Sequence, residues 1–451
     1  MKLTALLLRA VSSVIFCGVA IAATRPHYGG TLRVALREAP LSLNPSQPDW
    51  VEDRNLFSLL FDTLVVLDEQ GRPSPSLATS WQSESGGQRW QFVLRQNVSF
   101  QDGTPLNAES VAASLRGANP AWKVFSSNDS VIIERDSPAP DMPAELALAR
   151  NSIVKQVGDK FLGTGPFTIS HWEAGKAIGL AAKEDYWGGR PFLDAIEIDL
   201  GKNFRDQMVA FDLGKAQLIE VPPEQAHKTA TEGHDVETSA PVELVVLVFN
   251  ADPPTPAERK LRDALSLSID RKSLNTVVAQ NGGEPTGSLL PDWMTGYGFL
   301  FPSDVNMTRA QQERAEVPQA NLWSLGFNPN DSILRLIAER VVLSARDAGL
   351  RMQVGNSGPA DVRLIRVTTP SLDPQIALSE LAAKLGFPAP SFGQGTIEDL
   401  YAAESAFLQS QRVIPLLYLR DAYAVSTRVK GWWKARDGTW HLSDVWLGEN
   451  P

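Results

Sequence analysis

The chain has 451 residues, of which 43% are hydrophobic and 21% are charged, and its formal net charge at pH 7 is −10. This composition is typical of a globular protein and excludes an intrinsically disordered one, and the length suggests about three folding units. The acidic balance disfavours nucleic acid and anionic membrane surfaces as partners.

Residues 1–22 have the three parts of a secretory signal peptide. Lys2 and Arg9 give a positively charged start, Ala10–Ala22 is a short apolar run, and Ala20–Ala22 fits the A-x-A cleavage pattern. The run is too short to span a membrane, and no later stretch has ~18 uninterrupted apolar residues. We therefore expect an exported, periplasmic protein that begins at Ala23.

The single cysteine, Cys17, lies inside this signal peptide. A lipid-attachment cysteine needs a small residue before it, and the bulky Phe16 stands there instead. We therefore expect a free protein rather than one with a lipid anchor at Cys17. The mature chain then has no cysteine, and so neither a disulfide nor thiolate chemistry.

The N-terminal half contains several short strands and turns. Thr31–Leu36 and Trp90–Leu94 alternate apolar and polar residues, which predicts half-buried strands. Asn107 is placed to cap a helix that ends at Gly117, and Phe204–Phe211 has the apolar spacing of a second helix. This half is therefore expected to be mixed α+β.

The C-terminal half alternates helices and strands. Thr255 and Pro256 are placed to start a helix. Leu334–Ala345 and Leu400–Phe407 have helical spacing, whereas Val362–Val367 reads as a strand. Such alternation predicts crossover connections and a mostly parallel sheet.

Motifs for catalysis or metal binding are missing from the sequence. The five histidines do not stand at metal-ligand spacing, and no H-E-x-x-H is present. Gly163–Pro166 is glycine-rich but lacks the Lys-Ser/Thr end of a phosphate-binding loop, and Gly355–Gly358 does not match the G-x-S-x-G nucleophile turn. We therefore expect no catalytic residues, no metal site and no cofactor, and hence not an enzyme.

Five blocks of the chain resemble, in the same order, the family 5 extracellular solute-binding proteins of ABC importers. This is the peptide- and nickel-type family, which includes the dipeptide- and oligopeptide-binding proteins. The blocks are GGTLRVAL (29–36), LLFDTLVVLDEQGRPSPSLATSW (59–81), WQFVLRQNVSFQDGTPLNAESVAASL (90–115), GTGPFTISHWEAGKAIGLAAKEDYWGGRPFLDAIEI (163–198) and LRDALSLSIDRKSL (261–274).

The resemblance implies an α/β protein with the two-lobed periplasmic binding protein fold, mixed α+β in its N-terminal lobe. It implies crossovers between the lobes near Phe249–Asn250 and Tyr418–Leu419. The expected boundaries are lobe I over 23–45, 163–250 and 420–451, an inserted subdomain over 46–162, and lobe II over 251–419. Where the family usually has a strand after Met307–Asp331, either the strand is absent or Ile333–Ile337 provides it.

The resemblance also implies a function. Such a receptor binds a peptide-like or other small solute in the cleft between its lobes and closes around it by a hinge motion. It then delivers the solute to an ABC permease in the inner membrane, and it works as a monomer.

Candidate ligand-binding residues come from loops and strand ends. Asp49 and Trp50 follow a strand-exit loop, and Trp293 stands in another irregular stretch. Loops on a rigid scaffold often carry binding residues, although a loop tryptophan that only covers a lobe is an equal alternative. Asn250 ends an apolar strand at the expected crossover, where its side-chain amide is predicted to bond backbone next to the cleft, with an ordinary strand-end asparagine as an equal alternative.

The remaining candidates concern specificity. In dipeptide and oligopeptide receptors an aspartate holds the α-amino group of the peptide, and in the matching stretch here only Asp373-Pro374 fits. A buried ammonium group without a carboxylate is strongly disfavoured. We therefore expect a ligand other than an ordinary zwitterionic dipeptide: a blocked or larger peptide, a sugar-like solute or a metal chelate. Arg366 is the candidate for contacting an anionic group, with an ordinary surface arginine as the alternative.

Two other functions are weighed against the receptor. A secreted α/β hydrolase would need a nucleophile–base pair or a metal site, and the sequence supplies neither. A secreted chaperone-like peptide-binding protein or a sensor stays open, because a peptide receptor can also hold unfolded chains. A rise in melting temperature with one small solute would distinguish the receptor.

Overall fold

The computed structural model describes residues 25–37, 39–40, 42–45, 53–84, 86–318, 322–355, 360–393, 395–436 and 438–448. The predicted signal peptide with Cys17 and the candidate residues Asp49 and Trp50 lie outside these residues. Within the described ranges, no helix is both long and apolar enough to cross a membrane.

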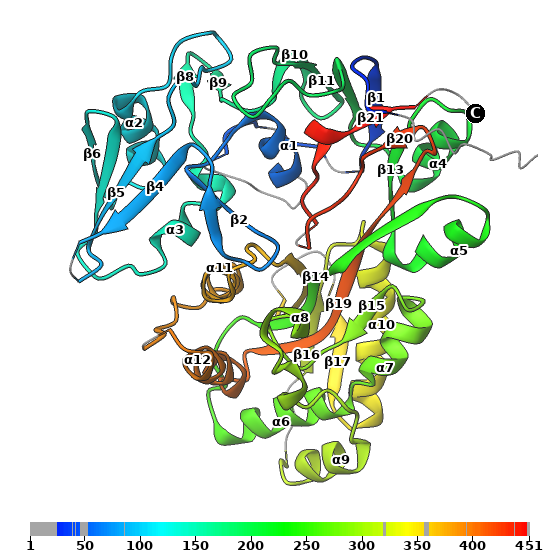
Figure 1. The fold of residues 1–451 in the computed structure, drawn as a ribbon. Coiled ribbons are helices and arrows are strands. Elements are labelled where there is room, and N and C mark those ends of the chain that lie inside the picture. The colour runs from blue at the N-terminus through cyan, green and yellow to red at the C-terminus, as the bar shows by residue number, and fades with distance from the viewer. Residues whose placement is uncertain are drawn as a thin grey trace, which may run out of the picture.

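Lobe I is built on the strands at the top of Figure 1. Leu32 and Val34 pack against the first helix, whereas Ala35 belongs to a second apolar cluster on the opposite face. This alternation follows from the two-residue period of a strand. In sheet order the strands are β10 (Phe167–Glu173), β11 (Ala177–Ala182), β12 (Ala195–Asp199), β1 (Thr31–Ala35) and β13 (Leu218–Val221). The helices of this lobe are α1 (Asp53–Leu60), α4 (Phe204–Asp212), η2 (Pro223–Gln225) and α5 (Ala226–Thr231).

An insert between β1 and β10 has a sheet and a core of its own. Asn107 caps its helix α2 by accepting a hydrogen bond from the Ser110 backbone N–H at 2.8 Å. The sheet order is β4 (Ala78–Ser83), β5 (Arg89–Leu94), β7 (Ser130–Glu134) and β6 (Lys123–Ser127). The other elements are β2 (Val65–Leu67), β3 (Pro73–Pro75), α2 (Ala108–Ala118), α3 (Met142–Glu145), η1 (Ala149–Asn151), β8 (Lys155–Val157) and β9 (Lys160–Leu162).

Lobe II holds the other strands of the same sheet, with helices on both of its faces (Figure 1). Its strands are β14 (Val236–Phe249), β15 (Gly283–Pro285), β16 (Leu322–Gly326), β17 (Arg351–Val354), β18 (Val362–Thr368) and β19 (Val413–Val425). Val245 and Leu247 of β14 belong to one core cluster, and Leu244 and Val246 belong to another. A strand that is buried on both faces reads as a continuous apolar run.

The helices of lobe II fall into two groups that match these two clusters. The first group packs on the face of Val245 and contains α6 (Pro256–Ser268), α7 (Arg271–Ser273), η3 (Leu274–Val278), α9 (Met307–Ala315) and α10 (Ser332–Asp347). The second group packs on the face of Leu244 and contains α8 (Asp292–Thr295), η4 (Gly298–Leu300), α11 (Pro374–Leu385) and α12 (Ile397–Gln409). The chain ends with β20 (Val429–Lys430), η5 (Leu442–Asp444) and β21 (Trp446–Leu447), which return to lobe I.

Two long antiparallel strands, β14 and β19, join the lobes (Figure 1). The start of β14 pairs with the lobe I end of β19, and the register between the strands shifts around Pro241. Phe249 pairs with Val362 and lies in the core of lobe II. The chain therefore leaves lobe I near Pro241, earlier than the crossover expected at Asn250, because the apolar run before Asn250 belongs to lobe II.

Two expectations for the C-terminal half are wrong. The sheet is mixed: β16 pairs in parallel with β17 and β18, but β14 is antiparallel to β18 and β19, because β14 and β19 run between the lobes in opposite directions. The suggestion that Ile333–Ile337 forms a strand is also wrong, since these residues lie within α10, and the strand β16 lies inside Met307–Asp331 rather than after it. Trp323 and Leu325 are the buried alternate residues of β16.

Candidate functional site

A cleft of about 1020 Å³ lies between the lobes. Residues of α1, the segment that follows it, and the stretch 439–443 line it from lobe I. Residues of β18, the loop 370–372 and α11 line it from lobe II. The volume is at the upper end of what small-molecule sites usually offer. It therefore suits a small solute or a short oligomer.

A buried ion cluster lies where β14, β18 and α10 meet. Arg366 of β18 donates from Nη1 to Asp331 Oδ2 at 2.9 Å, and from Nη2 to the carboxylate of Glu243. The side chains of Arg366, Glu243 and Asp331 are 16%, 7% and 12% exposed. Burial lowers the pKa of Arg366, but the two negative charges outweigh it and raise the pKa above its usual value.

All three residues of this cluster line the cleft, and they also line a smaller cavity of about 60 Å³ beside it. The predicted anion-binding residue Arg366 is therefore at the cleft, but two carboxylates already hold its guanidinium. Sequence reasoning missed Glu243 and Asp331. Glu243 could have been noticed as the one charge that begins an apolar strand run, and Asp331 as the N-cap of α10.

Asp373 serves as the N-cap of α11. Its Oδ1 accepts hydrogen bonds from the backbone N–H groups of Gln375 and Ile376, both at 3.0 Å. Burial raises the pKa of Asp373, while these two bonds oppose the rise. The preceding Ser371 and Leu372 line the cleft, whereas Asp373 is not part of the lining. One of its carboxylate oxygens therefore caps the helix, and the residue itself lies outside the lining of the cleft.

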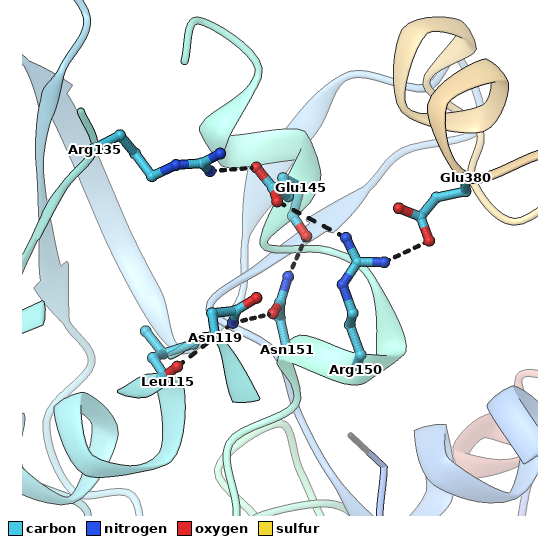
Figure 2. A network of polar contacts seen from close by, with 7 residues as sticks. All are labelled: Leu115, Asn119, Arg135, Glu145, Arg150, Asn151 and Glu380. Carbon is cyan, nitrogen blue, oxygen red and sulfur yellow. Dashed lines mark hydrogen bonds and ion pairs between the residues drawn. The ribbon is translucent and has the colours of Figure 1, made fainter. Parts of the chain in front are cut away.

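The insert touches lobe II across the rim of the cleft, as Figure 2 shows. Arg150 donates to Glu380 of α11 and also lies 3.8 Å from Glu145, which Arg135 holds at 3.0 Å. Asn151 Nδ2 donates to the backbone carbonyl of Glu145 at 2.6 Å. The Arg150 guanidinium thus lies between a carboxylate of the insert, Glu145, and a carboxylate of lobe II, Glu380.

Apolar and acidic residues add to this contact between the insert and α11. Ala144 and Leu148 of the insert pack with Ile376 of α11 in one buried cluster. Burial raises the pKa of Asp141 to about 6, and the nearby charge of Asp373 adds to the rise. The contact between the insert and α11 therefore combines an ion pair, an apolar patch and two neighbouring carboxylates.

Two predicted residues lie outside the lining of the cleft. Trp293 donates from Nε1 to the Pro241 carbonyl at 2.8 Å, and the Arg436 guanidinium lies 5.8 Å from its ring centre. It therefore sits beside the connection between the lobes. Asn250 is at the far end of β14, where its Nδ2 donates to the Ala360 carbonyl.

Asp62 is a third acidic residue of the cleft that sequence reasoning missed. It accepts hydrogen bonds from Thr164 Oγ1 at 2.8 Å, Tyr186 OH at 3.0 Å and Trp187 Nε1 at 2.8 Å. Burial raises the pKa of Asp62 despite these bonds. Both Asp62 and Tyr186 line the cleft. The only available signal was the position of Asp62, inside the second family block.

The side chains around the cleft are of several chemical kinds. Over the described residues, no group of three or more His, Cys, Asp or Glu side chains is placed to hold a metal ion. The cleft is instead bounded by apolar walls, hydrogen-bonding side chains and ion pairs. Such a mixture fixes the orientation of a bound solute.

Two lobes joined by a pair of strands around a cleft define the fold of a solute-binding protein. The chain belongs to the bacterial extracellular solute-binding proteins, family 5, since the model of the middle region of that family matches residues 72–373. The predicted family and the predicted two-lobed α/β fold are confirmed.

Individual relatives are distant. The nickel-binding periplasmic protein of Escherichia coli is 25% identical over 269 residues, which are 52% of this chain and 51% of that protein. A probable di/tripeptide-binding protein of Pseudomonas aeruginosa is 23% identical over 388 residues, which are 73% of each chain. The chain thus aligns with only about half the length of the nickel-binding relative.

Solved structures show the same fold. The periplasmic binding protein DppA of Helicobacter pylori, in complex with the peptide STSA, superimposes with a TM-score of 0.80 and 18% identity. The match covers 94% of this chain and 99% of that protein. The family is one of solute-binding receptors rather than enzymes.

Proposed function

We propose that this protein is the solute-binding receptor of an ABC importer. It captures a peptide-like or other small solute in the cleft and delivers it to a permease in the inner membrane. It is exported to the periplasm by the signal peptide at residues 1–22 and works there as a monomer. Family membership and the ligands of its relatives, nickel and a peptide, support this proposal.

The observation that carries the proposal is the cleft itself. Its walls come from both lobes, and its rim is held by Arg150 of the insert and Glu380 of lobe II. A ligand favours the closed state only through contacts that it makes in that state. Because one solute would touch both walls at once, its binding would favour closure.

The proposed solute is not an ordinary zwitterionic dipeptide. The carboxylate of Asp373 caps α11, and the guanidinium of Arg366 is held by two carboxylates. The amino group of a dipeptide would therefore not find Asp373 in the cleft lining, and its carboxylate would compete with Glu243 and Asp331 for Arg366. Calorimetry with a mixed dipeptide library should show no binding at micromolar concentrations. Tight binding that is lost in Asp373→Asn would overturn this proposal.

The receptor function is tested by mass spectrometry of small molecules released from the mature protein after purification from its own periplasm. We expect one solute class, in stoichiometric amount, that raises the melting temperature when added back. Recovery of no small molecule, together with no thermal shift from any periplasmic extract fraction, would contradict the receptor function.

A further inference from the structure

The tip of the hairpin formed by β2 and β3 touches lobe II. Gly71 at this tip has a φ of +77°, and a Cβ atom added to it would lie 2.5 Å from the backbone carbonyl oxygen of Leu372. That distance is too short for a real Cβ atom, and positive φ suits glycine, so only glycine fits here. The hairpin contact adds to the ion pair of Arg150 with Glu380 (Figure 2). The insert therefore meets lobe II through its hairpin as well as through η1.

The insert belongs to the lobe I side of the cleft. Gln101 of the insert donates from Nε2 to the carbonyl oxygens of Leu60 in α1 at 3.0 Å and of Phe167 in β10 at 2.8 Å. Arg150 lines the cleft from the insert, and its partner Glu380 lines it from lobe II. Parting these two walls separates the insert from α11. The contact between the insert and α11 therefore restrains opening of the cleft.

Asp141, just before α3, brings an uncompensated carboxylate to this contact. Among the described residues its side chain has neither a hydrogen-bond nor an ion-pair partner, and it does not cap α3. Burial raises the pKa of Asp141 to about 6, and the charges of Asp373 from lobe II and Glu145 from the insert add to the rise. A carboxylate of lobe II is therefore close enough to Asp141 to disfavour its ionised form.

The other charged groups around Asp141 are paired with one another. These pairs are Arg135 with Glu145, Arg150 with Glu380, and Arg72 of the hairpin with Asp68. One carboxylate oxygen of Asp373 accepts two backbone N–H groups of α11, and burial raises the pKa of Asp373 as well. When both are ionised, the contact holds Asp141 and Asp373 together as like charges, which is unfavourable.

We propose that the contact between the insert and α11 is a proton-dependent latch, which holds the cleft closed when Asp141 is protonated and loosens when Asp141 and Asp373 are both ionised. Parting the walls returns Asp141 to water and takes Asp373 away from it, so its pKa falls towards the usual 3.8. The closed form thus binds this proton more tightly than the open form. Its advantage is fully present below pH 3.8 and is lost as the pH rises through about 6.

The latch acts on any solute that needs the closed form. Apparent affinity falls in proportion to the fraction of the protein that is competent to bind. The latch therefore makes capture tighter in acid than at neutral pH, whichever solute the cleft holds.

The experiment measures the distance between two spin labels on the ligand-free mature chain. The only cysteine of the sequence, Cys17, lies in the predicted signal peptide. Labels can therefore be attached at Ala121→Cys in the insert and at Ala402→Cys in α12, both of which are exposed positions. Pulsed electron paramagnetic resonance then gives the fractions of closed and open molecules at pH 5 and at pH 8.

Three variants are compared with the labelled wild type. Asp141→Asn is uncharged at both pH values, and Gly71→Ala carries a methyl group that has no room beside Leu372. The control is Asp159→Asn, which changes an exposed acid in the turn between β8 and β9. Melting temperatures at both pH values establish that each variant is folded.

We expect the ratio of closed to open molecules to fall by up to about tenfold between pH 5 and pH 8 in the wild type and in Asp159→Asn. In Asp141→Asn the ratio should change by less than about threefold and should exceed the wild-type ratio at pH 8. Gly71→Ala should lower the ratio at both pH values. A wild-type ratio that does not change with pH, or an equal pH dependence in Asp141→Asn, would overturn the latch. So would an unchanged ratio in Gly71→Ala, and each of these results would leave the receptor function standing.

Discussion

The buried cluster of Arg366 with Glu243 and Asp331 should contribute strongly to stability. In Arg366→Met the packing volume is largely kept, but the carboxylate of Glu243 loses its cation inside the protein. Asp331 still accepts hydrogen bonds at one carboxylate oxygen from two backbone N–H groups of α10. Uncompensated charge at such a site costs about 3–5 kcal/mol. Because Arg366 is 16% exposed, we expect the lower end, about 3 kcal/mol.

Urea unfolding, followed by circular dichroism at neutral pH, measures this loss. The double variant Arg366→Met/Glu243→Gln is the control, since neutralising Glu243 removes the stranded charge. It should recover about half of the lost free energy or more, which is a positive coupling in a double-mutant cycle. A loss below about 1 kcal/mol in Arg366→Met, with no recovery in the double variant, would refute the reasoning.

Three further predictions follow from buried or bridging contacts. Glu404 lies in α12, and its burial raises its pKa from 4.5 to about 7. The contribution of the protonated side chain to stability is therefore fully present below pH 4.5 and is lost as the pH rises through 7. Urea unfolding should show that the free energy of unfolding decreases by about 2–3 kcal/mol between pH 5 and pH 8. This decrease should be absent in Glu404→Gln. Arg150→Gln should favour an open cleft by about 1 kcal/mol, seen as a larger radius of gyration. Arg116→Gln, whose partners Glu109 and Val124 both lie within the insert, should leave it unchanged. Trp293→Phe removes the bond to Pro241 and should lower the unfolding free energy by about 1 kcal/mol, whereas an unchanged value would contradict the bond.

Local sequence patterns predicted where several of the helices begin. Asn107 begins α2 and Thr255 begins α6, as the capping signals predict. These signals are local, because a cap satisfies backbone groups within one turn of itself. The family blocks supplied the two-lobed arrangement, which no local pattern could have specified.

The site was harder to predict because it depends on distant pairings. Arg366 was recognised, but Asp331 lies 35 positions from it and Glu243 lies 123 positions from it. Their charges meet only when β14, β18 and α10 come together. The same applies to the crossover near Pro241, since the apolar run of β14 does not show which lobe it enters.

The central claim is that the two lobes close over one solute. Small-angle X-ray scattering tests it most directly, on the mature protein freed of small molecules and then saturated with the solute identified by mass spectrometry. Closure predicts a smaller radius of gyration with solute than without it. An unchanged radius of gyration at saturation would contradict closure, and with it the assignment of the interlobe cleft as the binding site.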